Sequence, residues 1–130
     1  MRKTNSTNYL DWIERGDHDS EDAARLLKNG GYADTICFHA QQAVEKYLKG
    51  FLVYKKINPP QIHHLEELAK HCAKVDKEFL VFLDRCLILT RYYIETRYPP
   101  LVTIEYSKDE AIAALKITEE IIEFINDRIK

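Results

Sequence analysis

The stretch of sequence that decides the fold runs from Phe38 to Lys49 and reads FHAQQAVEKYLK. Apolar residues recur in and around this stretch at the spacing of one broad side of an α-helix. They are Ile36, Ala40, Ala43, Val44, Tyr47 and Phe51. At about 100° per residue, a polar stripe lies beside this apolar side, and Gln41 flanks its other edge. The stripe consists of His39, Gln42, Lys46 and Lys49. The pattern predicts a central helix over about residues 33–54, with hydrogen-bonding side chains along the border of the core.

Helix-breaking residues divide the rest of the chain. The turns are expected at residues 30–31, 58–60 and 98–100, where Gly or Pro residues gather. Apolar periodicity between them predicts further helices over about residues 8–28, 65–74, 79–96 and 107–129. Ser107 and Glu110 have the spacing of a capping box, in which a hydroxyl and a carboxylate each bond an amide at a helix start. The segment 101–104 resembles a strand but is too short and too isolated to found a sheet.

The predicted fold class is therefore all-α, an up-and-down bundle of four main helices plus a short helix, in a single domain over residues 1–130. The small residues Gly16 and Ser20 lie in the middle of the apolar face of the first helix. They favour close approach of another helix over a hollow for another group. The fourth helix has one apolar face expected in the core, namely Phe79, Phe82, Leu83, Cys86, Leu87, Thr90, Tyr93 and Ile94. Its other apolar residues, which predict a partner surface, are Val81, Ile88, Leu89 and Tyr92.

The composition is that of an ordinary globular protein. Nineteen Lys and Arg residues oppose 21 Asp and Glu residues, and the net charge of −2 provides no general attraction for nucleic acid. Cys37, Cys72 and Cys86 are odd in number and lie among apolar residues, which predicts buried, reduced thiols and a cytoplasmic location. The chain shows neither the apolar stretch of a secretion signal nor a segment that could span a membrane, so no membrane contact is expected.

No motif for a cofactor or a metal stands out from the sequence. His64 and His71 are two helical turns apart, too far for one small ion, so a structural role for His64 at the start of the short helix is favoured over a zinc site. The run ERGDHDSED, residues 14–22, is expected to be a solvated helix face without chemistry. We therefore expect neither a cofactor nor a metal ion.

The run from Phe38 to Ala43, followed by Glu45, Lys46 and Lys49, resembles the second-helix motif of the HEPN domain, the higher eukaryote and prokaryote nucleotide-binding family. Other matches follow in the family's order and extend the resemblance over nearly the whole chain. They are Trp12 and Asp19, the turn at residues 30–32, His64 with Leu65, and residues 97–99. Gly16 and Ser20 depart from the usual Ala and Leu, and this departure should weaken packing without changing the fold.

The resemblance implies a helical bundle that often dimerises, and members that act beside small nucleotidyltransferases in toxin–antitoxin pairs. Many members of the wider superfamily are metal-independent ribonucleases. These carry an arginine followed four to six residues later by a histidine, where the fourth helix ends. Neither Arg91 nor Arg97 is followed by a histidine at that spacing. His39 could supply the base only if the second and fourth helices pack together, so ribonuclease activity is the less favoured hypothesis.

The candidate ligand-binding residues come from two helices: His39, Gln42 and Lys46 from the second, and Arg91, Arg97 and Tyr98 from the fourth and its exit. In this hypothesis the arginines bind phosphates, His39 and Gln42 bond the edges of a nucleotide or RNA ligand, and Tyr98 stacks on a base.

Plainer alternatives stand beside each role. Arg91 has the spacing to form surface ion pairs with Asp84 and Glu95. Lys46 and Lys49 are solvated in this alternative, and His39 borders the core. Arg97 would need a carboxylate partner such as Asp17 or Asp19 if the helix reached it, but Pro99 favours an earlier helix end.

The sequence thus leaves three functional hypotheses. The first is a non-catalytic HEPN-type module that binds a nucleotide or related anion, forms a homodimer through the fourth helix and partners a nucleotidyltransferase. The second is a ribonuclease toxin with an altered site. The third is a structural partner domain without a ligand.

Overall fold

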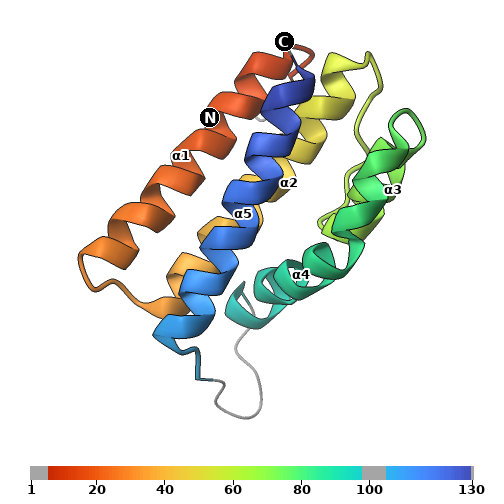
Figure 1. The fold of residues 1–130 in the computed structure, drawn as a ribbon. Coiled ribbons are helices and arrows are strands. Elements are labelled where there is room, and N and C mark those ends of the chain that lie inside the picture. The colour runs from red at the N-terminus through yellow and green to blue at the C-terminus, as the bar shows by residue number, and fades with distance from the viewer. Residues whose placement is uncertain (1–5, 98–104, 130) are drawn as a thin grey trace.

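The computed structural model describes residues 6–97 and 105–129, and Figure 1 shows how its helices are arranged. The elements are α1 (Tyr9–Lys28), α2 (Ala33–Tyr54), α3 (Leu65–Ala73), the 3₁₀ helix η1 (Lys77–Phe82), α4 (Leu83–Arg97) and α5 (Lys108–Arg128). Helices α1 and α5 pack along α2 and along each other, while α3 and α4 pack against α2 and against each other. The described residues contain no strand. The predicted all-α bundle of four main helices plus a short one is confirmed.

The core is organised around α2, which contacts α1, α3, α4 and α5. Its apolar side is almost completely buried, as the predicted periodicity requires. The buried residues include Ile36, Ala40, Val44, Tyr47, Leu48, Phe51 and Leu52. Full burial of one large apolar side chain contributes about 1.5–3 kcal/mol, so this side of α2 supplies much of the stability of the bundle.

Helices α1 and α2 lie close together at Gly16. A Cβ atom at Gly16 would lie 2.6 Å from Cδ1 of Tyr47 and 3.2 Å from the carbonyl oxygen of Ala43. The Tyr47 hydroxyl also donates a hydrogen bond to Asp17 at 2.5 Å, which fixes the ring against α1. The small residue at position 16 therefore serves close helix packing, as predicted.

The helix ends follow local rules of capping. The Ser107 hydroxyl accepts a hydrogen bond from the Glu110 amide at 3.0 Å, so α5 begins where the capping-box spacing predicts. The Glu110 carboxylate accepts a hydrogen bond from the Tyr92 hydroxyl at 3.0 Å, which ties α5 to α4. Helix α1 ends at Lys28, and Gly30, which follows the C-cap residue Asn29, has a φ of 77° in the left-handed region that suits glycine.

The fourth predicted helix differs from expectation in two ways. Its first part is the 3₁₀ helix η1, and α4 includes Arg97, although Pro99 was expected to end the helix earlier. The predicted core face is also shifted, since Leu87 is half exposed whereas Leu89 and Tyr92 are buried. A 3₁₀ helix has about 3.0 residues per turn and an α-helix about 3.6, so the change at residue 83 rotates the later residues relative to a continuous α-helix.

A row of apolar side chains on η1 and α4 is left uncovered. Leu80, Val81, Leu87 and Ile88 are between 43 and 61% exposed, and we call them the η1–α4 apolar face. Val81 and Ile88 were predicted to be surface residues, but Leu80 and Leu87 were not. In the described part of the chain, no helix is long and apolar enough to cross a membrane.

Candidate functional site

A carboxylate of α1 joins two polar residues of α2. Asp19 is 9% exposed, and its Oδ1 lies 2.9 Å from Nδ1 of His39. Its other oxygen, Oδ2, accepts a hydrogen bond from the Lys46 ammonium group. His39 and Lys46 are two turns apart on the same face of α2, and the carboxylate of Asp19 contacts both of them. We call these three residues the Asp19 cluster.

The Asp19 cluster corrects two expectations. Asp19 belongs to the run 14–22 that was expected to be solvated, and Lys46 is an ion-pair partner instead of a solvated lysine. A sequence signal for Asp19 existed, because it follows Gly16 by three residues and precedes Ala23 by four. This spacing places the carboxylate on the face of α1 that packs against α2.

A second polar cluster lies on the neighbouring side of α2. Glu45 is 6% exposed, and its Oε2 accepts a hydrogen bond from Nζ of Lys49 at 3.0 Å. Its Oε1 accepts a bond from Gln41 at 3.2 Å, and Nδ1 of His63 lies 3.0 Å from Oε2. Gln42 donates to Gln41 at 2.6 Å. Lys49, expected in solvent, is thus buried in an ion pair within this Glu45 cluster.

Aromatic rings connect the two clusters with α4. The imidazole of His63 stacks on Tyr93 with ring centroids 4.3 Å apart and an interplanar angle of 14°. Phe38 stacks on Tyr93 at 6.3 Å and meets His39 edge to face at 6.1 Å. Helices α2 and α4 therefore pack together, which was the condition for His39 to reach the fourth helix, and Tyr93 is a residue of α4 that makes this contact.

The predicted ligand-binding residues do not form one cluster in the described structure. His39 and Lys46 meet at Asp19, while Gln42 joins the Glu45 cluster through Gln41. Arg91 is exposed, and no hydrogen bond or ion pair between described side chains joins it to His39, Gln42 or Lys46.

The remaining two candidate ligand-binding residues are Arg97 and Tyr98, at the end of the fourth helix and just after it. Arg97 is the last residue of α4, with a side chain outside the described part, and Tyr98 lies wholly outside the described residues.

Four of the five histidines, His18, His39, His63 and His64, each lie close to a carboxylate. His64 immediately precedes α3, and its Nδ1 lies 3.6 Å from Glu66. His63 is bound to Glu45, as described above, and His18 lies 3.9 Å from Glu14 on the exposed side of α1. Within residues 6–97 and 105–129, no three His, Cys, Asp or Glu side chains gather into a group that could hold a metal ion.

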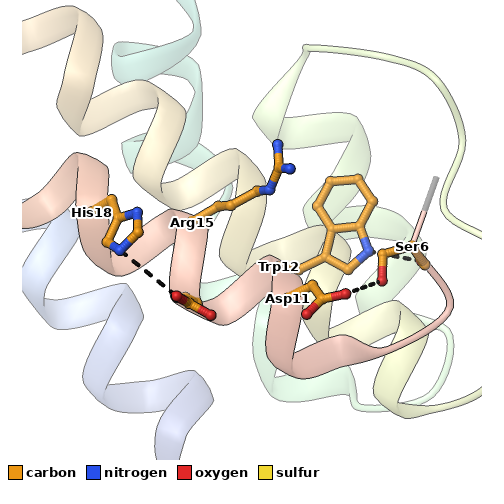
Figure 2. A pocket seen from close by; sticks show the side chains of 6 residues that line it. Ser6, Asp11, Trp12, Arg15 and His18 are labelled. Carbon is orange, nitrogen blue, oxygen red and sulfur yellow. Dashed lines mark hydrogen bonds and ion pairs between the residues drawn. The ribbon is translucent and has the colours of Figure 1, made fainter. Parts of the chain in front are cut away.

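A hollow of about 610 Å³ lies on α1. It is lined by Ser6, Asp11, Trp12, Glu14, Arg15 and His18. Figure 2 shows Trp12 and Arg15 directed to the same side of α1, with Ser6 bonded to Asp11 and His18 facing Glu14. The lining residues carry both signs of charge, so this hollow offers no concentrated positive potential for an anion.

A smaller hollow of about 270 Å³ lies between the segment before α3 and α4. It is lined by Gln61, Ile62, His63, His64, Thr90 and Tyr93. Sequence reasoning did not unite these residues, because no helical spacing connects residues 61–64 with Thr90 and Tyr93.

Comparisons with known proteins agree with this geometry. The HEPN domain family model matches residues 9–128, from the start of α1 to the end of α5. A relative named "Putative toxin MJ1304", from Methanocaldococcus jannaschii, is 29% identical over 135 residues, which cover 92% of this chain and 86% of the relative.

Two crystal structures share the fold. TT1696 from Thermus thermophilus has a TM-score of 0.79 and 28% identity, over 94% of this chain and 98% of that one. ST0689, described as an archaeal HEPN homologue, has a TM-score of 0.73 and 24% identity, over 95% of this chain and 98% of that one. Because the family match spans every described helix, the chain belongs to the HEPN domain family.

Proposed function

We propose that this protein is a non-catalytic HEPN-type module that binds a nucleotide or a related phosphate-bearing anion and partners a small nucleotidyltransferase in a toxin–antitoxin-type pair. The observation that carries the proposal is an exposed cation, Arg91, on the same side of α4 as Leu87 and Ile88 of the η1–α4 apolar face. Exposed apolar patches mark interaction sites, and Arg is enriched among interface residues.

A second copy of the chain is the proposed occupant of the η1–α4 apolar face. In a two-fold dimer the same surface of each copy meets its equivalent, so the two Arg91 side chains would come near the same axis. Like charges repel, and a phosphate group between two guanidinium groups would relieve that repulsion. A homodimer and an anion site therefore support one another in this arrangement.

The toxin–antitoxin context is supported by the name of the Methanocaldococcus jannaschii relative, "Putative toxin MJ1304". The non-catalytic assignment is supported by the sequence after Arg91 and Arg97, where no histidine stands at the spacing of the ribonuclease signature. A nucleotidyltransferase partner follows from the family resemblance and would be tested by copurification of the two proteins after coexpression.

One observation favours a ribonuclease as the second candidate. The Nδ1 atom of His39 is held by Asp19, and the imidazole is 26% exposed, an arrangement that orients Nε2 as a base. Cleavage also needs a cation for the developing phosphorane charge. Lys46 is already paired with Asp19, and Arg91 makes no bond to the cluster, so the first candidate is preferred.

Light scattering tests the homodimer. We expect the wild-type protein to have twice the mass of one chain, and Ile88→Asp to be monomeric because it places a charge in the η1–α4 apolar face. Ile112→Asp is the matched control, since Ile112 of α5 is 44% exposed and lies outside this face. A monomeric wild type, or dissociation by both variants alike, would contradict the proposed interface.

Calorimetric titration with ATP, GTP and a short RNA tests the anion site. We expect saturable binding that Arg91→Ala or Arg97→Ala weakens at least tenfold, whereas Arg15→Ala, an exposed cation of α1, leaves it unchanged. Absence of binding to all three would support the structural-partner hypothesis. Cleavage of the RNA in the presence of a chelator, abolished by His39→Ala, would replace the proposal by the ribonuclease candidate.

A further inference from the structure

The smaller hollow beside α4 has Tyr93 and two imidazoles in its lining. Tyr93 forms one side of the hollow, and the His63 ring stacks on Tyr93. The His63 side chain is nevertheless 48% exposed. Ile62 adds an aliphatic surface. Pockets for drug-sized ligands have about 300–1,000 Å³, so a hollow of about 270 Å³ suits a single small ring system.

The polar groups around this hollow are held in fixed positions by buried contacts. Glu45 orients His63 from the α2 side at 3.0 Å. The Thr90 hydroxyl accepts a hydrogen bond from the Leu65 amide and donates one to Glu66, each at 2.8 Å. These bonds connect α4 with the start of α3, so the walls of the hollow are preorganised by the packing of two helices.

The charged side chains described around the hollow are carboxylates, which favour hydrogen-bond donors. Its described lining contains no Lys or Arg. The Glu45 carboxylate lies 3.0 Å from His63, and the Glu66 carboxylate lies 3.6 Å from His64. The Gln61 amide and the two imidazoles add both donors and acceptors. A planar heterocycle with an exocyclic amino group matches this combination of a half-exposed imidazole, an aliphatic surface and nearby carboxylate acceptors.

We propose that the hollow lined by Gln61, Ile62, His63, His64, Thr90 and Tyr93 holds the amino-bearing base of a nucleotide, either a purine or a pyrimidine. This inference rests on the proposed function and locates the base of its ligand. Arg91, the cation that carries the proposed function, immediately follows Thr90 on α4. The base site and the proposed phosphate site thus lie on one helix.

Binding measurements on nucleosides separate the base site from the phosphate site. The probes are adenosine, cytidine, uridine, AMP and inorganic phosphate, each titrated calorimetrically into the full chain. Gln61→Trp fills the hollow from an exposed position, and His64→Ala removes a half-exposed ring, so neither change disturbs the core. His71→Ala is the matched control, because His71 lies near the other end of α3.

We expect adenosine and cytidine to bind the wild type more tightly than uridine, which has no exocyclic amine. Gln61→Trp and His64→Ala should each weaken the binding of adenosine and of AMP at least tenfold and leave the binding of inorganic phosphate unchanged. His71→Ala should change none of these affinities. Arg91→Ala should weaken the binding of AMP and of phosphate but not the binding of adenosine.

The possible failures are distinguishable from one another. AMP binding that both hollow variants leave intact would overturn the base site while preserving the proposed function. A wild type that binds neither AMP nor phosphate would overturn both proposals. Thermal unfolding of each variant by circular dichroism establishes that lost binding reflects the hollow and not the fold.

Discussion

Asp19 of α1 is bonded at the same time to His39 and Lys46, which stand two turns apart on α2. One buried carboxylate therefore fixes both the separation of the two helices and their relative register. The same two helices meet at Gly16 and Tyr47, one turn away along α1, where no side chain could be added without displacement. Polar and steric contacts thus specify one arrangement of α1 on α2.

Replacing Asp19 by Ala should lower the free energy of unfolding by about 2–3 kcal/mol, because hydrogen bonds to charged groups contribute about 1.5–3 kcal/mol and two donors lose their acceptor. Asp22→Ala is the control. Asp22 pairs with Arg25 at 2.6 Å on the exposed side of α1, and its loss should cost less than about 1 kcal/mol. Urea unfolding monitored by circular dichroism measures both, and equal losses would contradict the role of Asp19.

Replacing Gly16 by Ala should destabilise the protein although Ala is the better helix former. The gain in helix propensity is about 1 kcal/mol, whereas overpacking costs about 1–3 kcal/mol, and the new Cβ would lie 2.6 Å from the Tyr47 ring. In a Tyr47→Leu background the clash with the ring is removed and the 3.2 Å contact with the Ala43 carbonyl remains, so Gly16→Ala should destabilise the protein less there. A double-mutant cycle of unfolding free energies measures this coupling, and additive effects would refute the steric explanation.

Lys56 is strained and offers a stabilising substitution. Its φ of 62° is left-handed, and it follows α2 at the position where Gly is preferred. The Lys56 amide bonds the Val53 carbonyl at 2.9 Å and the Ile57 amide bonds the Leu52 carbonyl at 2.8 Å, the hydrogen bonds of a Schellman motif. Lys56→Gly should therefore raise the free energy of unfolding by up to about 1 kcal/mol. Lys55→Gly, at a residue with φ of −84°, should not, and a thermal melt compares the two.

Protonation of the Asp76 carboxylate should account for part of the loss of folding stability in acid. Burial tends to raise the pKa of Asp76, but hydrogen bonds from Arg128 and from the Glu78 amide outweigh it and hold the pKa below its usual value. In the unfolded chain the carboxylate takes up a proton at a higher pH. Its stabilisation is therefore complete above about pH 4–5 and is lost as the pH falls through the lower, folded-state pKa.

The comparison of wild type with Asp76→Asn isolates this charge, since Asn also caps helices. The difference in unfolding free energy should be constant near neutral pH and shrink below about pH 4. Asp127→Asn controls for removal of an exposed carboxylate from the end of α5. A difference that stays constant down to about pH 2 would mean that the charge of Asp76 is not involved.

The three cysteines should resist alkylation in the folded protein. Burial raises the pKa of Cys37 and of Cys86 to about 12, and raises that of Cys72 as well. At about pH 8 only about one thiol in ten thousand is then ionised, and the thiolate is the reactive form. Intact-mass spectrometry after iodoacetamide treatment should show no adduct in buffer and three adducts in urea at the same pH. Rapid labelling of the folded chain would indicate that a thiol is accessible.

Most of the bundle could be predicted because its signals are local. The apolar period of α2, the turn at Gly30 and the capping Ser107 each act within one or two helical turns, and the structure confirms all three. The register of α4 could not be predicted from a continuous α-helical period, because the preceding residues form a 3₁₀ helix. Leu87 and Leu89 exchange their expected environments for this reason.

The candidate site was harder to predict, since its contacts join residues that no period relates. Glu45 of α2 contacts His63 in the connection between α2 and α3, and Tyr93 of α4 contacts both His63 and Phe38. Sequence spacing identified His39 and Lys46 as members of one stripe, but their common partner Asp19 comes from the preceding helix. Side-chain networks of this kind depend on tertiary packing and become visible only in three dimensions.

The central position of α2 also limits how the length of this chain can change during evolution. One inserted residue would rotate everything after it by about 100°, moving polar and apolar residues to the wrong neighbours on every side. No flanking helix could adjust to this alone, because α1, α3, α4 and α5 all rest on α2. Insertions and deletions should therefore accumulate among relatives in the connections between helices, while α2 keeps a constant length.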